Sequence, residues 1–89
     1  METITANQQG DKFISEVITG TGNDMALHVE LENDGVAVLQ RSLDGNEWLD
    51  AIILFRDARL FEVTIGSIVE GQKLRLVTTS RPTLIQYIQ

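Results

Sequence analysis

Hydrophobic residues along this chain recur at every second position. The clearest case is MALHVEL at 25–31, in which apolar residues alternate with smaller or more polar ones. Side chains two positions apart point to the same face of a β-strand, so this period predicts strands with one buried face. KFISEVIT at 12–19 is rich in β-forming residues but alternates less regularly. The other alternating segments are LFEVTI at 60–65, KLRLVT at 73–78 and TLIQYIQ at 83–89.

Short turn-forming segments separate these strands, and no helical period interrupts them. They are TGTGND, ENDG, LDGN, EGQ and SRP. Closely spaced strands of this kind predict an all-β protein, either an antiparallel sandwich or a barrel. Of the two we favour a small antiparallel β-sandwich, Ig-like or jelly-roll-like, with about seven short strands. Residues 13–89 are predicted to form this single domain. Residues 1–12 are polar and unpatterned, so they are predicted to be a flexible N-terminal arm without a strand.

The segment VLQRSLDGNEWLDA at 38–51 predicts a β-hairpin around Asp44 and Gly45, because glycine accepts a positive φ in a tight turn. A two-residue loop would pair Arg41 with Trp48. A three-residue loop ending at Gly45 would pair Arg41 with Glu47 and would align the apolar residues on one face. The second register is favoured because it also places opposite charges across the strands.

Composition narrows the classes of function. The chain has 89 residues, a formal net charge of −6 and no cysteine. Basic residues do not cluster, so nucleic-acid binding is not expected. The longest apolar run, AIILF, is far shorter than the roughly 20 residues that span a bilayer. The N-terminal residues have neither the basic nor the apolar region of a signal peptide, so we expect a soluble protein made in the cytoplasm.

No arrangement of residues points to catalysis, to a metal or to a cofactor. His28 is the only histidine and lies on the polar side of its strand, so a plain surface role is favoured over that of a ligand or base. The serines lack a G-x-S-x-G motif and the chain has no cysteine, so a nucleophile is not indicated. DGNEWLD superficially resembles a calcium loop but has Leu49 and Phe55 where an EF-hand requires Gly and Glu.

Three side chains are candidates for binding. Trp48 is the only tryptophan; it could stack on a sugar ring, although a place in the core or between the sheets is the favoured interpretation. Arg56 and Arg59 flank Asp57 on a predicted loop. Arginine is enriched at interfaces because its planar group pairs with carboxylates and stacks on rings, but a local ion pair with Asp57 explains these residues equally well.

Two motifs and the order of the strands carry a resemblance over about residues 13–89. LQRSLDGNEWLD at 39–50 is followed by an apolar strand, a turn containing EG, and LRLVTTS at 74–80. This order resembles that of the small β-sandwich virion proteins of tailed bacteriophages. An aromatic residue usually precedes the RL pair in that family, whereas this chain has Lys73 and Leu74 there.

The resemblance implies a non-catalytic virion protein, similar to the head decoration or cement proteins that bind the lattice of the major capsid protein, often as homotrimers. Phe13, Arg56 and Arg59 would then contact the shell, and the arm would lie across a neighbouring subunit. The alternatives are a carbohydrate-binding or structural module of a fibre or baseplate, with Trp48 as the stacking residue, and a head–tail adaptor.

Overall fold

The computed structural model describes all 89 residues and contains eight strands and no helix. It therefore has no helix that could cross a membrane. The strands, in chain order, are β1 (Glu2–Ile4), β2 (Ala6–Gln9), β3 (Lys12–Ser15), β4 (Ile18–Thr19), β5 (Met25–Ser42), β6 (Leu49–Ile65), β7 (Lys73–Thr78) and β8 (Pro82–Ile88). All of them join one antiparallel sheet, which confirms the predicted all-β antiparallel class.

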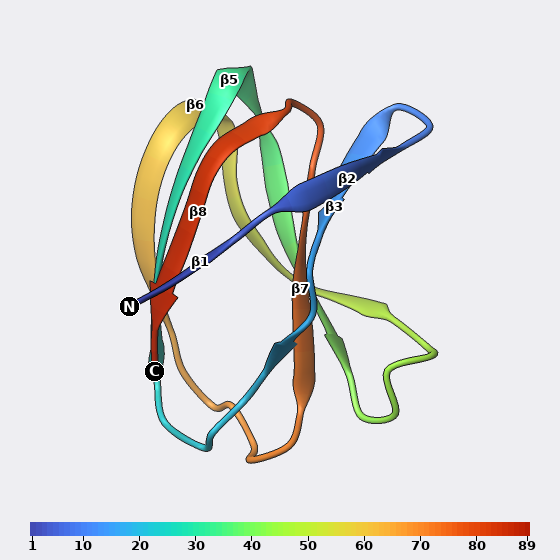
Figure 1. The fold of residues 1–89 in the computed structure, drawn as a ribbon, viewed down its shortest axis with the longest axis vertical. Coiled ribbons are helices and arrows are strands. Elements are labelled where there is room, and N and C mark those ends of the chain that lie inside the picture. Colours follow the sequence, from blue (N-terminus) through green and yellow to red (C-terminus); the bar gives the residue numbers. More distant parts are fainter.

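The long hairpin of β5 and β6 divides this sheet into two halves. Residues 26–31 of β5 pair with β8, whereas residues 37–42 pair with β7 (Figure 1). We call β1, β8 and the paired parts of β5 and β6 at 25–31 and 60–65 the first half-sheet. The second half-sheet contains β2, β3, β4, β7 and the parts of β5 and β6 at 35–42 and 49–58. The two halves curl toward each other across the core.

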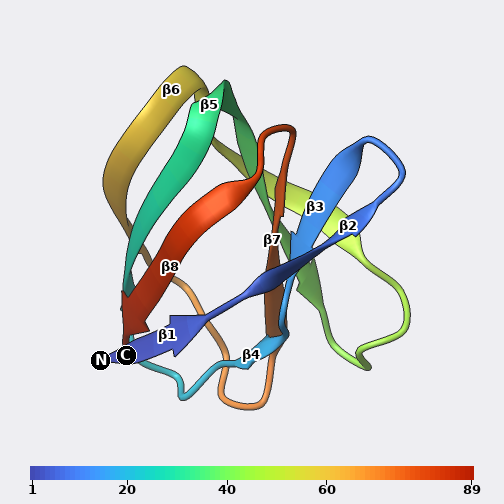
Figure 2. The ribbon, with the colours of Figure 1, turned by 45° about the horizontal axis from the view of Figure 1, so that its top comes forward.

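The N-terminal segment connects the two half-sheets on the side opposite β6. β1 pairs with β8, and β2 pairs with β3 through a turn in which Gly10 has a φ of 65° (Figure 2). The backbone N–H of Glu16 also donates to the carbonyl of Thr5, between β1 and β2, at 2.9 Å. The sheet is thereby nearly closed into a barrel.

The prediction of an arm without strands is therefore wrong for residues 2–9. Their polar side chains point mostly to solvent, so the alternation that marks a half-buried strand is absent, but their backbone groups still complete the sheet. The structure has eight strands, compared with the predicted seven, because β1 and β2 are added and residues 12–19 form two strands, while β5 and β6 each join two predicted strands into one.

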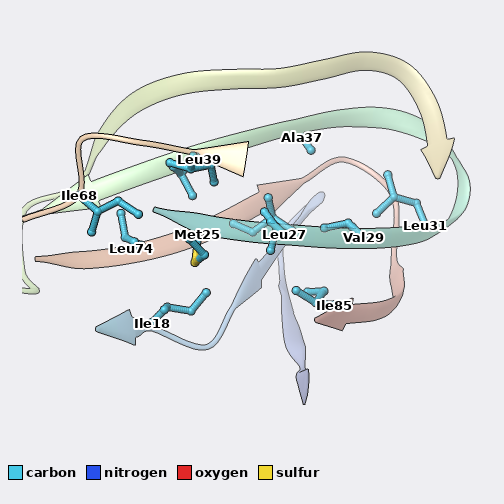
Figure 3. Packing of buried hydrophobic residues seen from close by; sticks show 12 residues of the cluster. Ile18, Met25, Leu27, Val29, Leu31, Ala37, Leu39, Ile68, Leu74 and Ile85 are labelled. Atoms are coloured by element: carbon cyan, nitrogen blue, oxygen red, sulfur yellow. The ribbon is translucent and has the colours of Figure 1, made fainter. Parts of the chain in front are cut away.

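The hydrophobic core lies between the curled half-sheets and confirms the predicted alternation. Met25, Leu27, Val29 and Leu31 of MALHVEL are at most 3% exposed, and Leu74 of β7 and Ile85 of the neighbouring strand β8 belong to the same cluster (Figure 3). Burying one such side chain stabilises the fold by about 1.5–3 kcal/mol. The complete buried cluster is Ile18, Met25, Leu27, Val29, Leu31, Ala37, Leu39, Ile65, Ile68, Leu74, Leu76 and Ile85.

The loop between β5 and β6 differs from both predicted registers. Arg41 pairs with Leu49, so residues 43–48 form the connection. The carboxylate of Asp44 accepts the backbone N–H groups of Asn46 at 2.8 Å and Glu47 at 3.1 Å, together with the hydroxyl of Ser42. These bonds hold the pKa of Asp44 below its usual value. They also satisfy backbone donors that a tighter hairpin would have paired across the strands.

Candidate binding surface

The outward faces of the two half-sheets differ in chemistry. On the first half-sheet, neighbouring strands bring Glu62, His28, Gln86 and Thr3 into one polar row. On the second half-sheet, the equivalent row runs from the polar Asn7 of β2 through Ile14, Val77 and Val38 to Ile53, and we call its four apolar members the aliphatic row. Residues directly opposite each other on antiparallel strands point to the same side, so these four side chains form a continuous apolar stripe.

The aliphatic row faces solvent because its residues alternate with core residues. Val38 lies between the buried Ala37 and Leu39, and Val77 lies between the buried Leu76 and Thr78. Val38, Val77 and Ile14 are half-buried, and Ile53 at the edge is 49% exposed. Contiguous apolar surface of this kind, bordered by polar groups, is typical of protein-binding sites.

A hydrogen-bonded polar network borders the aliphatic row. The amide nitrogen of Gln40 donates to the carboxylate of Asp50 at 2.8 Å, and the amide oxygen of Gln40 accepts from Nε of Arg75 at 2.7 Å. The guanidinium of Arg75 then lies 4.2 Å from the centroid of the Trp48 ring. Partial burial lowers the pKa of Arg75, although a guanidinium remains charged near neutral pH. The network therefore fixes a cation, an amide and a carboxylate in a defined order.

A surface cavity of about 400 Å³ connects the network to the aliphatic row. Lys12 and Arg75 provide positive charge at its border, and Asp50 provides negative charge. The remaining lining residues are Gln9, Ile14, Val36, Val38, Gln40, Val77, Thr78 and Thr79. This site has an apolar floor and charged borders, so it is suited to binding a partner by shape and charge.

The structure gives Trp48 neither of its two predicted roles in full. Its side chain is half-buried and does not belong to the core cluster, so the favoured core position is wrong. One face of its ring is covered by the Arg75 guanidinium, so only the other face remains for a ligand. A cation over an aromatic ring contributes about 0.5–1 kcal/mol at an exposed site.

The three predicted contact residues do not form one cluster. Phe13 lies on β3, where the guanidinium of Arg81 is 5.0 Å from its ring centroid. Arg56 and Arg59 lie on β6, on the far side of β5 and β7. The predicted loop around these arginines is wrong, because β6 continues through it with a positive φ of 52° at Asp57. Neither arginine forms an ion pair within the chain, so the alternative of a local pair with Asp57 is also wrong.

His28 is a surface residue, as predicted, but it has two carboxylate partners. Its Nε2 is 2.9 Å from Glu30 and its Nδ1 is 3.3 Å from Glu62. The hydrogen bond to Glu30 is the main cause of a raised pKa, and Glu62 adds to it. The structure has no group of three or more His, Cys, Asp or Glu side chains placed so that they could hold a metal ion.

Sequence reasoning missed the network of Gln40, Asp50 and Arg75. A usable signal existed, since Gln40 and Arg75 fall on the outward positions of strands whose inward positions are leucines. Their contact depends on the pairing of β5 with β7, which local sequence does not specify. Comparisons with family models, curated proteins and solved structures found no significant match for this chain.

Proposed function

We propose that this chain is a non-catalytic structural protein of a virion, a decoration protein that binds the lattice of the major capsid protein. It would be made in the host cytoplasm and incorporated into particles. The single observation that carries the binding part of the proposal is the aliphatic row on the outer face of the second half-sheet. The motifs at 39–50 and 74–80 support the virion part. In this proposal, the two half-sheets correspond to the layers of an Ig-like or jelly-roll-like sandwich.

The chemistry of the surface supports a protein partner. When an apolar strip of a partner covers these aliphatic side chains, the complex is stabilised by about 25 cal/mol for each Å² of apolar surface removed from water. The Arg75 and Lys12 cations and the Asp50 carboxylate at the border select a partner with the opposite charges and set its orientation. A lattice that holds many copies also stabilises a small domain by mass action.

The proposal is tested by counting copies per particle. Virions produced from the genome that encodes this chain would be purified, and the chain would be quantified against the major shell protein by mass spectrometry. We expect a ratio near one copy of this chain for each copy of the major shell protein. A handful of copies per particle would contradict a lattice role and would favour a tail, fibre or junction.

A matched pair of variants tests the surface. Val38→Glu places a charge in the middle of the aliphatic row, whereas Thr64→Glu places the same charge on an exposed outward position of the first half-sheet. We expect Val38→Glu to lower occupancy at least about tenfold, the effect of losing a central contact of about 1.4 kcal/mol or more. Thr64→Glu should leave occupancy unchanged. Full occupancy by a folded Val38→Glu protein, checked by circular dichroism, would contradict the proposed surface.

Carbohydrate binding is the second candidate, favoured by the polar network beside Trp48. Sugars are bound by aromatic stacking combined with planar polar side chains, and Gln40, Asp50 and Arg75 supply the latter. A glycan array probed with the native chain and with Trp48→Ala tests it. Binding that disappears in the folded variant would support this candidate, and a native chain that binds no glycan would exclude it.

A further inference from the structure

Strand β6 leaves one edge of the sheet open. It has 17 residues and pairs only with β5, so the backbone groups along its other side have no partner strand. Proteins usually protect such an edge, because it can pair with another chain. The first part of this edge is also apolar, with Leu49 74%, Ile52 39% and Ile53 49% exposed.

Around Ile53, the charged residues of β6 are placed so that they would pair with the charged residues of a second, antiparallel copy of β6. If two copies of β6 pair antiparallel with Ile53 opposite Ile53, Asp50 of each copy stands opposite Arg56 of the other. Further out, Glu47 in the adjoining loop stands opposite Arg59. Opposite charges directly across antiparallel strands stabilise a pair, and like charges destabilise it.

Neighbouring registers lack this complementarity. Moving the pairing by one residue in one direction places Asp50 opposite Asp57, and moving it in the other places Asp50 opposite Phe55. Only the register centred on Ile53 gives both charge pairs. A one-residue shift would also exchange the inward and outward faces of one copy relative to the other. The charge pairs and the alternation of faces therefore both favour the same register.

The aliphatic row ends at Ile53, on the open edge. A two-fold axis through this residue would therefore join the rows of two copies into one stripe running across both sheets. Ile53 would become central and covered, while Val38 and Val77 would stay accessible on the outer face. The pairing is thus compatible with a further partner on that face.

We propose that two copies of this chain associate through the β6 edges, antiparallel and two-fold symmetric about Ile53. The β5–β6 ladder shifts register on both sides of the Ile52–Ile53 pair, so the edge is irregular and offers few main-chain hydrogen bonds. The apolar contacts of 49–55 and the Asp50–Arg56 pairs therefore carry the association. Such a contact is isologous and closes at two copies, whereas a trimer needs two different surfaces.

The charge pairs make the test specific. In Asp50→Arg, the introduced guanidinium of each copy would face the native Arg56 of the other copy, so two cations would repel. In Arg56→Asp, two carboxylates would face each other in the same way. Each variant alone should therefore be monomeric in sedimentation-velocity runs at concentrations where the native chain is a dimer. In an equimolar mixture, the reversed position 50 of one protein faces the reversed position 56 of the other, and the native Arg56 faces the native Asp50. Both pairs then carry opposite charges, so a one-to-one heterodimer should form.

Leu60→Asp is the matched control, because Leu60 is an exposed apolar residue of β6 outside the proposed contact. It should dimerise as the native chain does. Thermal melts of each variant would show that it is folded. A native chain that is monomeric or trimeric throughout, or a mixture of folded Asp50→Arg and Arg56→Asp proteins that stays monomeric, would overturn the proposal. Shell binding is not needed for any of these readouts.

Discussion

At the scale of single residues, the outward positions of the strands determine what each face can bind. Val38 and His28 both lie on outward positions of β5, but their cross-strand neighbours differ. Val38 is surrounded by other aliphatic side chains and stays available for apolar contacts. His28 has a carboxylate on each ring nitrogen, so its hydrogen bonds are satisfied within the chain. The polar row around His28 is therefore hydrogen-bonded within the chain, whereas the aliphatic row leaves apolar surface without a partner.

The environment of His28 predicts a pH-dependent contribution to stability. Glu30 and Glu62 raise its pKa above the ordinary value of 6.5, so the folded chain holds the imidazolium proton more tightly than the unfolded chain does. The stabilisation is then fully present below pH 6.5 and is lost as the pH rises through the folded-state pKa. The groups facing the ring are these two glutamates and the neutral Gln86 of β8.

An NMR titration of the single imidazole measures this directly and should give a pKa above 6.5. Denaturant unfolding of the native chain and of His28→Gln at several pH values gives the linked stability. We expect the native chain to lose its advantage over His28→Gln as the pH rises beyond the folded-state pKa. Parallel stability profiles for the two proteins, or an imidazole pKa at or below the ordinary value, would contradict the prediction.

At the scale of the elements, β5 and β6 each serve both half-sheets. The ladder between them shifts register near Gly35, opposite the part of β6 where Asp57 has a positive φ. A Cβ on Gly35 would lie 2.8 Å from Oγ1 of Thr79 and 3.3 Å from the backbone nitrogen of Ser80, so a larger residue there would displace the segment that packs against it. The bend lets one hairpin leave the first half-sheet and continue in the second.

The sequence predicted those strands whose two faces differ and missed the others for physical reasons. Apolar and polar residues alternate in MALHVEL and KLRLVT because one face of each strand is buried and the other faces solvent, and both segments are strands in the structure. Residues 6–9 are exposed almost throughout, so period two has no hydrophobic signal there, although the Gly10–Asp11 turn was a usable hint of a hairpin. The loop at 43–48 escaped prediction because the carboxylate of Asp44, and not the strand pairing, sets its length.

The binding surface was less predictable than the strands. Its residues come from β3, β7, β5 and β6, and local sequence does not specify which strands become neighbours. Arg56 and Arg59 were selected from a pattern of charges, and the structure gives them a different setting on a strand edge. Their pairing with Asp50 and Glu47 becomes apparent only when a second copy is considered.

At the scale of the whole molecule, the sheet is closed on one side and open on the other. β1 and β2 bridge the half-sheets on the closed side, and β6 forms the open side. Both views place the chain termini close together, as the pairing of Glu2 with Tyr87 requires (Figures 1 and 2). The closed side should therefore govern the stability of the single chain, and the open side its association.

Closure by the N-terminal segment predicts that a single side chain there affects global stability. Ile4 pairs with Ile85 and packs against the core while remaining partly exposed, so Ile4→Ala should lower the free energy of unfolding by about 1–2 kcal/mol, less than a fully buried isoleucine would. Gln8→Ala, at an exposed position of β2, is the control and should change it by no more than about 0.5 kcal/mol. Urea unfolding followed by circular dichroism measures both. Equal stability of Ile4→Ala and the native chain would mean that the segment behaves in solution as a free arm, and that the sheet is stable without its closing strands.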